Sequence, residues 1–440
     1  MESTLLYVAA IGSLLAIVLL IVRPLWGVMA IFMIRPLVDT TWAQPVLFDL
    51  KLTELLSTAV PIVIFMRMIV DDGSRRPFSE MPLKWIWLVW SIDVCLFSSS
   101  IMFSQGLMDG LAVLMRHLNG LAGFYMVQAY CRDKQDFRRF VWALVIAGLF
   151  PIATGMAEGL TGAHWRVTEG EGGVIRNIGL YHDAITIRYY ALQTIMGLLL
   201  LIATAEKKST VINSAAFIYG LAAAFVIKGA FSKSGFLTLG AWLLLWPLFR
   251  KNIKALIALA GSVVVIALYY SKELMDSAGF VFVKEIAAVQ GQVGVDRTFA
   301  GRWYIWKDMI QEWQSLDRIA QMFGAGHVAT GAHNDYLQIL FHGGIVGITI
   351  YIVLLGAIGW SIARLLINKS DVWAVAALLA FIMWIVDTIG LVPSAYSGYQ
   401  WFVWGIIGLC LRMRQEENLT ISEPITTISV KRFRNLMGAV

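Results

Sequence analysis

The chain has 440 residues, of which 58% are hydrophobic and only 15% are charged. Soluble globular proteins carry roughly 25% charged residues and about 45–50% apolar ones, so this composition excludes a soluble enzyme. About 13 membrane spans of about 20 residues each would account for a share of the chain close to its apolar fraction. The sequence therefore predicts one all-α, polytopic membrane domain over 1–440. The three cysteines lie far apart without C-x-x-C spacing, which suggests neither a disulfide framework nor a zinc site.

The net charge of +6 could indicate a nucleic-acid partner, but the positions of the basic residues indicate membrane topology instead. Successive basic clusters are separated by two apolar runs each. Two crossings return the chain to the same side, so the clusters share one face, which the positive-inside rule makes cytoplasmic. The clusters contain Arg75, Arg76 and Lys84; Arg132, Lys134, Arg138 and Arg139; Lys207 and Lys208; Arg250, Lys251 and Lys254; Arg364 and Lys369; and Arg412, Arg414, Lys431, Arg432 and Arg434. We therefore expect the lipid bilayer, and no nucleic acid, as a partner.

The apolar runs predict about 12 or 13 membrane-spanning helices. The runs lie at 4–22, 24–42, 53–70, 85–103, 110–130, 140–160, 186–204, 211–231, 236–249, 255–271, 336–363, 371–391 and 400–411. Arg23-Pro24 separates the first two runs, which form either two spans or one span with a re-entrant piece. The count and the side of the N-terminus therefore stay open. Residues 1–23 lack a basic n-region and a small-residue cleavage site, which favours an anchor over a cleaved signal peptide.

Two longer segments fall on the outer face when the basic loops are inside: 161–185, and a large periplasmic loop at 272–332. Both carry charges of both signs, as expected of loops that are kept polar for a function. Residues 412–440 form a cytoplasmic tail. The large loop contains an apolar helical stripe, made of Trp303, Trp306, Ile310 and Trp313. This stripe predicts an interfacial amphipathic helix, which would anchor at the headgroup level and could also cover a lipid-substrate cavity.

Five of the six histidines lie in or beside these outer segments. Histidine is the side chain most easily poised as a general base near neutral pH, although a lone histidine is more often structural. His333 stands out because it lies where the large loop meets a membrane span, at a helix start that Asn334 or Asp335 could cap. On that helix Asp335, Gln338 and His342 recur at i, i+3 and i+7. This polar stripe is either a seam satisfied by neighbouring helices or the wall of a wet cavity.

Several cations are expected at or below the outer membrane surface, where a charge is costly and needs an anionic partner. They are Arg166, Arg176, Arg188, Lys228, Lys233, Arg297 and Arg302. Carboxylates on the same side could balance them: Glu169, Glu171, Asp183, Asp296 and Asp387. Alternatively, one pyrophosphate could satisfy several of them, because guanidinium groups match phosphate oxygens in bidentate geometry. No cluster of acidic ligands is present outside, which argues against an obligatory divalent metal.

The run HNDYL at 333–337, followed by GGIVGI at 343–348, resembles the H-N-x-x-L…G-x-x-G signature of the O-antigen ligase-like superfamily. That superfamily includes O-antigen ligases and polymerases of lipid-linked polysaccharides. Three shorter pieces agree with the resemblance. They are Gly301-Arg302 with Trp306, which resembles the G-R…W segment; Arg176 with Gly179, which resembles the R-x-x-G loop; and 232–235, which resembles the S-R-G turn but has Lys233 where arginine is usual.

The resemblance implies a GT-C-like fold and an inverting membrane glycosyltransferase that needs neither metal nor cofactor. Such an enzyme sits in the bacterial inner membrane and moves an undecaprenyl-pyrophosphate-linked glycan to an acceptor hydroxyl at the periplasmic face. His333 would take the acceptor proton, and Arg302 would stabilise charge on the departing pyrophosphate. The residues expected to bind the pyrophosphate or the glycan are Arg166, Arg176, Arg188, Lys233, Asn334 and Tyr336.

The acceptor separates two versions of this prediction. The first is an O-antigen ligase, which joins O-antigen to lipid A-core in lipopolysaccharide biosynthesis. The second is a polymerase, which uses the same chemistry with a second lipid-linked repeat as acceptor. A flippase or transporter is an alternative of another class, in which the cations line a path for an anionic glycolipid. Transporters bind near the bilayer midplane, whereas most of these cations are expected at the outer rim beside a candidate base, which favours an enzyme.

Overall fold

The computed structural model describes residues 2–47, 49–70, 77–169, 175–206, 209–258, 302–328, 331–368 and 371–422, with 260–261, 287–288, 290–292 and 294. Nearly all of them are helical, because a chain in lipid must satisfy its backbone N–H and C=O groups internally. The helices are α1 (Glu2–Val22), α2 (Pro24–Thr40), α3 (Leu52–Ile69), α4 (Lys84–Gln105), α5 (Leu107–Tyr130), α6 (Lys134–Ala147), α7 (Leu149–Thr161), α8 (Ala184–Ala203), α9 (Thr210–Gly229), α10 (Lys233–Phe249), α13 (Arg302–Ser315), α14 (Arg318–Phe323), α15 (Asp335–Asn368), α16 (Val372–Gly390) and α17 (Ser397–Ser422), with 3-10 turns η1 (Phe78–Glu80) and η5 (Pro393–Ala395). The strands of the described chain, β1 (Pro45–Leu47) and β2 (Leu50–Lys51), form one small antiparallel hairpin.

Eight helical segments of the described chain are long and apolar enough to cross a membrane. One of them, Lys134–Thr161, comprises α6 and α7, and the apolar helix α10 is slightly shorter than the others. The chain is therefore an all-α, multi-pass membrane protein. Helices occupy all the predicted spans except 255–271, most of which lies outside the described residues. The full count of spans stays a prediction.

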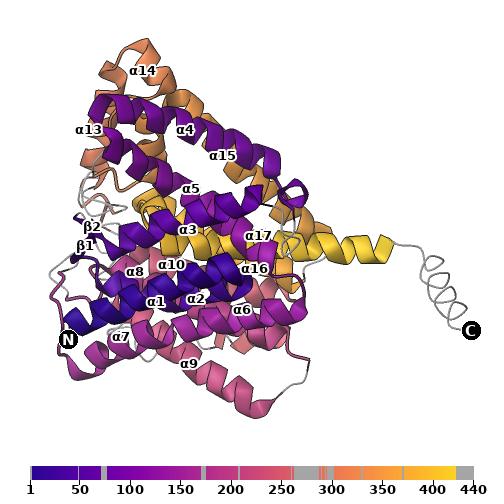
Figure 1. The fold of residues 1–440 in the computed structure, drawn as a ribbon. Helices are drawn as coiled ribbons and strands as arrows, with labels where there is room; N and C mark the ends of the chain where they lie inside the picture. Colours follow the sequence, from indigo (N-terminus) through magenta and orange to yellow (C-terminus); the bar gives the residue numbers. More distant parts are fainter. Residues whose placement is uncertain are drawn as a thin grey trace, which may run out of the picture.

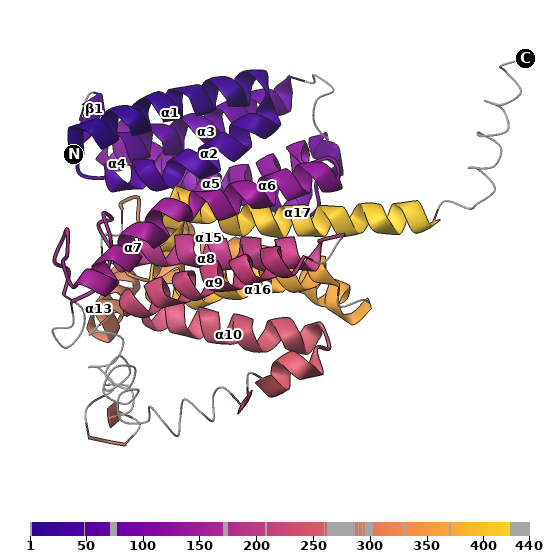
Figure 2. The ribbon, with the colours of Figure 1, turned by 90° about the horizontal axis from the view of Figure 1, so that it is seen from below.

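The two ends of the helix bundle differ in character. Figures 1 and 2 both show the N-terminus and α13 at one end of the bundle, while α17 projects from the other. At the first end, which we call the loop end, the Arg302 side chain donates a hydrogen bond to the backbone carbonyl of Gly390. At the opposite end Arg412 forms an ion pair of 2.5 Å with Glu80. The segments around two of the predicted basic clusters therefore meet at one end, as the alternating topology requires.

The first two apolar runs form a pair of antiparallel helices. Gly12 lies against Ile34 and Gly27 against Leu20, so contacts continue along most of both helices. The chain leaves the helical conformation at Arg23 (φ −136°, ψ 77°), and a proline begins α2, where its missing N–H costs nothing. Of the two alternatives for this region, the structure adopts two full helices.

Small residues allow α5 and α17 to pack closely along the centre of the bundle. A Cβ atom added at Gly123 would lie 2.8 Å from Trp401 Cα, and one added at Gly408 would lie 2.3 Å from Phe124 O. Such glycine contacts replace the hydrophobic driving force that is missing between helices in lipid. The helix α17 also continues past the predicted end of its span at 411, so it includes the beginning of the predicted tail.

The prediction of one continuous span over 336–363 is wrong, because α15 breaks at Gly344. This residue has φ 65° and ψ −159°, a combination that is essentially restricted to glycine. The rings of Tyr336 and Tyr351 lie only 5.9 Å apart, whereas a straight helix would separate these residues by about 22 Å. The first arm of α15, 335–343, therefore folds back on the second, and the polar stripe that begins at Asp335 lies on this short arm.

Candidate functional site

The last turn of α16 gathers half of the predicted site residues. Four consecutive residues, Asp387 to Gly390, each contact one of them. In chain order their partners are Arg188, Tyr336, Asn334 and Arg302. Of these four residues, the sequence pattern indicated only Asp387, and only as a counter-charge. They lie at the end of an ordinary apolar span, so no local pattern distinguishes them.

The carbonyl groups at the C-terminal end of α16 hold two loop segments together. Ile389 O accepts a hydrogen bond of 2.9 Å from Asn334 Nδ2, and Gly390 O accepts one from Arg302 Nη1. The last carbonyls of a helix have no partner within it, and they favour a cation. The same helix end therefore fixes Arg302 and the residue that follows His333, which brings the predicted base and the predicted cation together.

His333 itself is exposed and has a backbone φ of 44°, in a left-handed region that few non-glycine residues adopt. Its neighbours hold this conformation. Trp306 Nε1 donates a hydrogen bond of 2.9 Å to Ala332 O, and Asn334 Oδ1 accepts one of 3.0 Å from Leu337 N. The expected helix cap at Asn334 is thus confirmed. A strained residue that its surroundings hold in place is typical of functional sites.

Two effects keep the imidazole of His333 neutral. Partial burial, and then the positive charge of Arg302, lower the pKa of His333 from its ordinary value of 6.5. A neutral imidazole has a lone pair that can accept a proton from a hydroxyl group. The arrangement can therefore serve a general base that stays active at neutral pH.

Tyr336 connects this site to the lipid-facing side of the bundle. Its hydroxyl accepts a hydrogen bond of 3.2 Å from Thr388 Oγ1, and its side chain lines an apolar groove of about 500 Å³ between α15 and α16. Farther along this groove lie Gly356, where an added Cβ would meet no other described part of the chain within 4 Å, and Trp360, which is 65% exposed. The groove therefore offers an apolar surface that begins beside the His333 loop.

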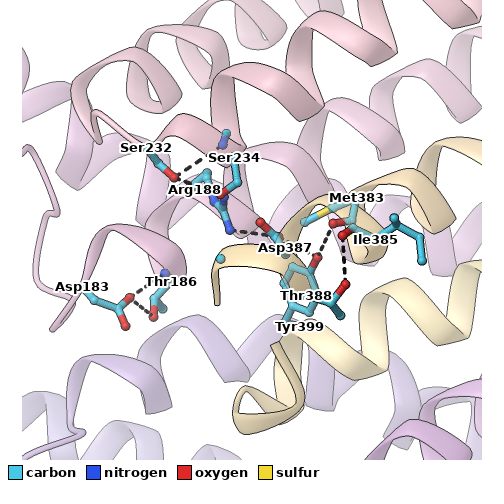
Figure 3. A network of polar contacts seen from close by, with 12 residues as sticks. Asp183, Thr186, Arg188, Ser232, Ser234, Met383, Ile385, Asp387, Thr388 and Tyr399 are labelled. Atoms are coloured by element: carbon cyan, nitrogen blue, oxygen red, sulfur yellow. Dashed lines mark hydrogen bonds and ion pairs between the residues drawn. The ribbon is translucent and has the colours of Figure 1, made fainter. Parts of the chain in front are cut away.

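Arg188 lies inside the bundle rather than at its surface (Figure 3). Its side chain is fully buried, and its Nη2 forms an ion pair of 2.9 Å with Asp387 Oδ2. Its Nη1 donates to the hydroxyl groups of Ser232 (3.2 Å) and Ser234. For Arg188 the counter-charge alternative holds, because an internal carboxylate balances it. The arginine also fixes the turn that carries Lys233 at the start of α10.

The segment that contains Arg176 is held against α7 and α9. The backbone N–H of Arg176 donates a hydrogen bond to Thr168 O. The backbone N–H of the next residue, Asn177, donates one of 2.9 Å to Gly229 O. Gly179, with φ 59°, donates its amide to the buried Glu158 at 2.7 Å. Since Gly229 lies just before the Lys233 turn, the structure brings the segments of Arg176 and Lys233 together on one side of α8.

Arg166 belongs to a third group of residues at the loop end. Its guanidinium lies 5.2 Å from the centre of the Trp42 ring, and that ring lies 5.0 Å from His182. His182 stacks on Tyr396 at 6.2 Å and forms an ion pair of 2.9 Å with Asp183. Tyr396 also donates its hydroxyl proton to Asp183 at 2.5 Å. The first outer segment is thereby joined to the 391–396 turn.

The helix α13 packs through a different face from the predicted stripe. Met309 is buried, and Trp313 packs against the same small cluster, while Trp306 bonds to Ala332. Trp303 and Ile310, which belong to the stripe predicted to anchor at the headgroup level, are 44% and 41% exposed. The residues of α13 that pack inside the protein therefore have the spacing i, i+3 and i+7 from Trp306, and they lie against the segment that leads to His333. Membrane anchoring of the predicted stripe stays a prediction.

No three His, Cys, Asp or Glu side chains of the described chain form a group that could hold a metal ion. Three of the predicted cations and counter-charges, Arg297, Asp296 and Glu171, lie outside the described residues. A reaction without metal or cofactor stays a prediction.

The site therefore consists of three groups along the loop end: Arg302, His333, Asn334 and Tyr336 at the end of α16; Arg188, Lys233 and Arg176 around α8; and Arg166 with its aromatic neighbours. The last turn of α16 joins the first two groups, and the 391–396 turn leads on to the third.

No protein-family model matches the chain, and no curated protein matches it significantly.

Proposed function

We propose that this chain is a membrane glycosyltransferase that moves a polyprenyl-pyrophosphate-linked glycan to an acceptor hydroxyl at the periplasmic face of a bacterial inner membrane. One observation carries the proposal. A partly exposed histidine is held in a strained conformation, and the adjacent arginine favours its neutral form. A base and a cation side by side are what glycosyl transfer from a pyrophosphate requires.

The reaction is a single displacement. The acceptor oxygen bonds to the anomeric carbon while His333 accepts the hydroxyl proton. The bond between that carbon and the phosphate oxygen breaks, and the electron pair leaves with the pyrophosphate. Arg302 stabilises the charge that develops on the leaving group, with Arg176, Lys233 and Arg166 as further cations on the same face. One displacement inverts the anomeric configuration.

The apolar groove below Tyr336 supports a lipid-linked donor. A headgroup beside His333 would leave its polyprenyl tail next to this groove, whose walls come from α15 and α16. The tail would then stay in an apolar environment while the pyrophosphate lies among the loop-end cations.

The internal charges favour an enzyme over a transporter. Arg188 is paired with Asp387, and the buried Arg35 is paired with Asp39 at 2.8 Å. Cations that are neutralised by the protein do not line a path for an anionic glycolipid. Among enzymes we propose an O-antigen ligase with lipid A-core as acceptor. A polymerase would use the same residues with a second lipid-linked repeat.

The test supplies the purified protein in nanodiscs with an undecaprenyl-pyrophosphate glycan and either lipid A-core or a second lipid-linked repeat. Mass spectrometry of the products separates ligase from polymerase. We expect transfer that survives excess EDTA, that His333→Ala abolishes, and that His327→Ala retains. The second histidine is a matched control because it also lies at the loop end, where it pairs with Glu312 instead. Transfer by His333→Ala at the wild-type rate would contradict the proposal.

A further inference from the structure

A small internal cavity of about 20 Å³ lies between the first arm of α15 and the helices α4 and α5. Asp335, His117 and Trp87 are among the residues that line it. These three side chains are almost completely buried, with exposed fractions of 0%, 4% and 1%. They come from three different helices, so the cavity lies where these helices meet beside the His333 loop.

Each of these side chains has one buried polar atom without a hydrogen-bond partner in the described part of the chain. These atoms are Asp335 Oδ2, His117 Nε2 and Trp87 Nε1. Two other polar groups around the cavity are paired: Asp335 Oδ1 accepts a hydrogen bond of 2.6 Å from Ser394, and Trp384 Nε1 donates one of 2.9 Å to Tyr351. Buried polar atoms without partners are rare and destabilising, so three around one cavity point to a shared ligand.

We propose that this cavity binds one internal water molecule that bridges Asp335, His117 and Trp87. A single water needs about 10–15 Å³ of such space and 2–4 polar partners, and the cavity offers both. The water would accept a hydrogen bond from Trp87 Nε1 and donate one to Asp335 Oδ2. Its remaining donor or acceptor would form a hydrogen bond with His117 Nε2. It would connect α4 and α5 to the first turn of α15, two residues from His333. The inference does not depend on the proposed function.

His117→Phe tests the proposal because it keeps the ring and removes the ring nitrogens. If the cavity holds water, the variant loses a hydrogen bond, so its midpoint of thermal unfolding falls below wild type. If the cavity is dry, the same change removes an unpaired polar atom and fills space, so a midpoint equal to or above wild type overturns the proposal. Circular dichroism at 222 nm measures this midpoint without depending on the tryptophans.

A double-mutant cycle with Trp87→Phe adds a second test. Both side chains bind the same water, so the combined loss in midpoint should be smaller than the sum of the single losses. The control cycle replaces Trp87→Phe by Trp242→Phe, since Trp242 is equally buried but donates to Leu379 O at 2.8 Å. We expect that control to be additive. Additive losses in the Trp87 cycle would overturn the proposal.

Direct observation does not require any variant. A cryo-EM map of the wild-type protein that resolves other buried waters should show density within hydrogen-bond distance of Asp335 Oδ2, His117 Nε2 and Trp87 Nε1. A map of that quality with an empty cavity would overturn the proposal.

Discussion

The positive charge of Arg302 affects whether the imidazole of His333 carries a proton. A general base must be neutral at the working pH, and a neighbouring guanidinium penalises the protonated imidazole. We therefore expect Arg302→Gln to raise the pKa of His333 toward its ordinary 6.5. NMR of histidine-labelled protein measures this pKa without requiring activity.

The control for this titration is Arg166→Gln. Arg166 lowers the pKa of a different histidine, His182, so its removal should raise the pKa of His182 and leave His333 unchanged. If neither arginine affects the pKa of His333, Arg302 does not set the charge of the base.

The shape of the Arg302 side chain matters as well as its charge. A guanidinium has five N–H donors in a plane, so it can bond to Gly390 O and still offer a fork to phosphate oxygens, whereas an ammonium is a point charge. We expect Arg302→Lys to lose about 2–4 kcal/mol of transition-state stabilisation. Turnover of lipid-linked glycan at matched protein levels measures this loss. The control is the opposite exchange, Lys233→Arg, which keeps the positive charge and should retain activity. Wild-type turnover in Arg302→Lys would mean that a point charge suffices there.

The pair of His182 and Asp183 gives the loop end a defined pH dependence. Burial opposes protonation of His182, but the hydrogen bond and charge of Asp183 outweigh it and raise the pKa of His182 above 6.5. Burial would also raise the pKa of Asp183, yet its bonds to His182 and Tyr396 lower that pKa to about 2. The histidine therefore stabilises the fold fully below pH 6.5 and loses its contribution as the pH rises through its raised pKa. The carboxylate stabilises above its ordinary 3.8 and loses its contribution as the pH falls toward about 2.

We expect the difference in thermal midpoint between wild type and His182→Gln to be largest between the two ordinary values, 3.8 and 6.5, and to shrink in alkaline buffer. Melting curves across that range measure the difference. His327→Gln is the control at the loop end. A difference that grows as the pH rises above 6.5 would contradict the pairing.

At the scale of the elements, apolar runs located the helices because each span needs about 20 apolar residues. The reversal of α15 escaped prediction for a physical reason. A Gly-Gly pair in an apolar run is compatible with a continuous helix, and the close approach of Gly344 to Met322 in α14 joins segments about twenty residues apart, which local sequence does not show. The family resemblance singled out His333, Asn334 and Arg302 as candidates, but the support of Asn334 and Arg302 at the end of α16 depends on contacts between segments far apart in sequence.

Gly344 is the residue on which this reversal depends. A Cβ atom there would lie 2.3 Å from the backbone carbon of Met322, and the φ of 65° already disfavours any other residue. We expect Gly344→Ala to destabilise the protein by roughly 1–3 kcal/mol or more through backbone strain, and to abolish transfer because the first arm of α15 carries the His333 loop. Thermal midpoints and transfer assays measure both effects.

The matched control lies on the second arm of α15. Gly356 has open space around its Cβ position, and alanine favours a helix more than glycine does. Gly356→Ala should therefore retain stability, and the thermal midpoint is its readout because Gly356 lines the apolar groove proposed for the lipid tail. Equal behaviour of the two alanine variants would mean that α15 does not need its break.

At the scale of the whole molecule, buried carboxylates connect helices that are distant in sequence, through an ion pair or through hydrogen bonds. Arg188 on α8 pairs with Asp387 on α16, and Asp39 on α2 accepts hydrogen bonds of 2.7 Å from both Tyr189 and Tyr190 on α8. Charges inside a membrane domain are costly unless they are paired, so each pair specifies one arrangement of its helices. The sequence could indicate these residues as candidates for function, but it could not show which charges are neutralised by partners inside the bundle.

The antiparallel pair of α1 and α2 determines on which side the chain begins. Two full helices make the number of crossings odd when the predicted span at 255–271 is included, so the two termini should lie on opposite faces. The ribbon agrees, because the N-terminus lies at the loop end and α17 leaves at the other (Figures 1 and 2). The positive-inside rule predicts that the α17 end is cytoplasmic, so we expect the N-terminus outside. In a bacterial host, we expect a C-terminal GFP fusion to fluoresce and an N-terminal epitope to be cleaved by protease in intact spheroplasts. A C-terminal tag that resists the same protease is the control for membrane integrity. Protection of both termini would show an even number of crossings, and either α1 with α2 or the 255–271 segment would then fail to cross the membrane.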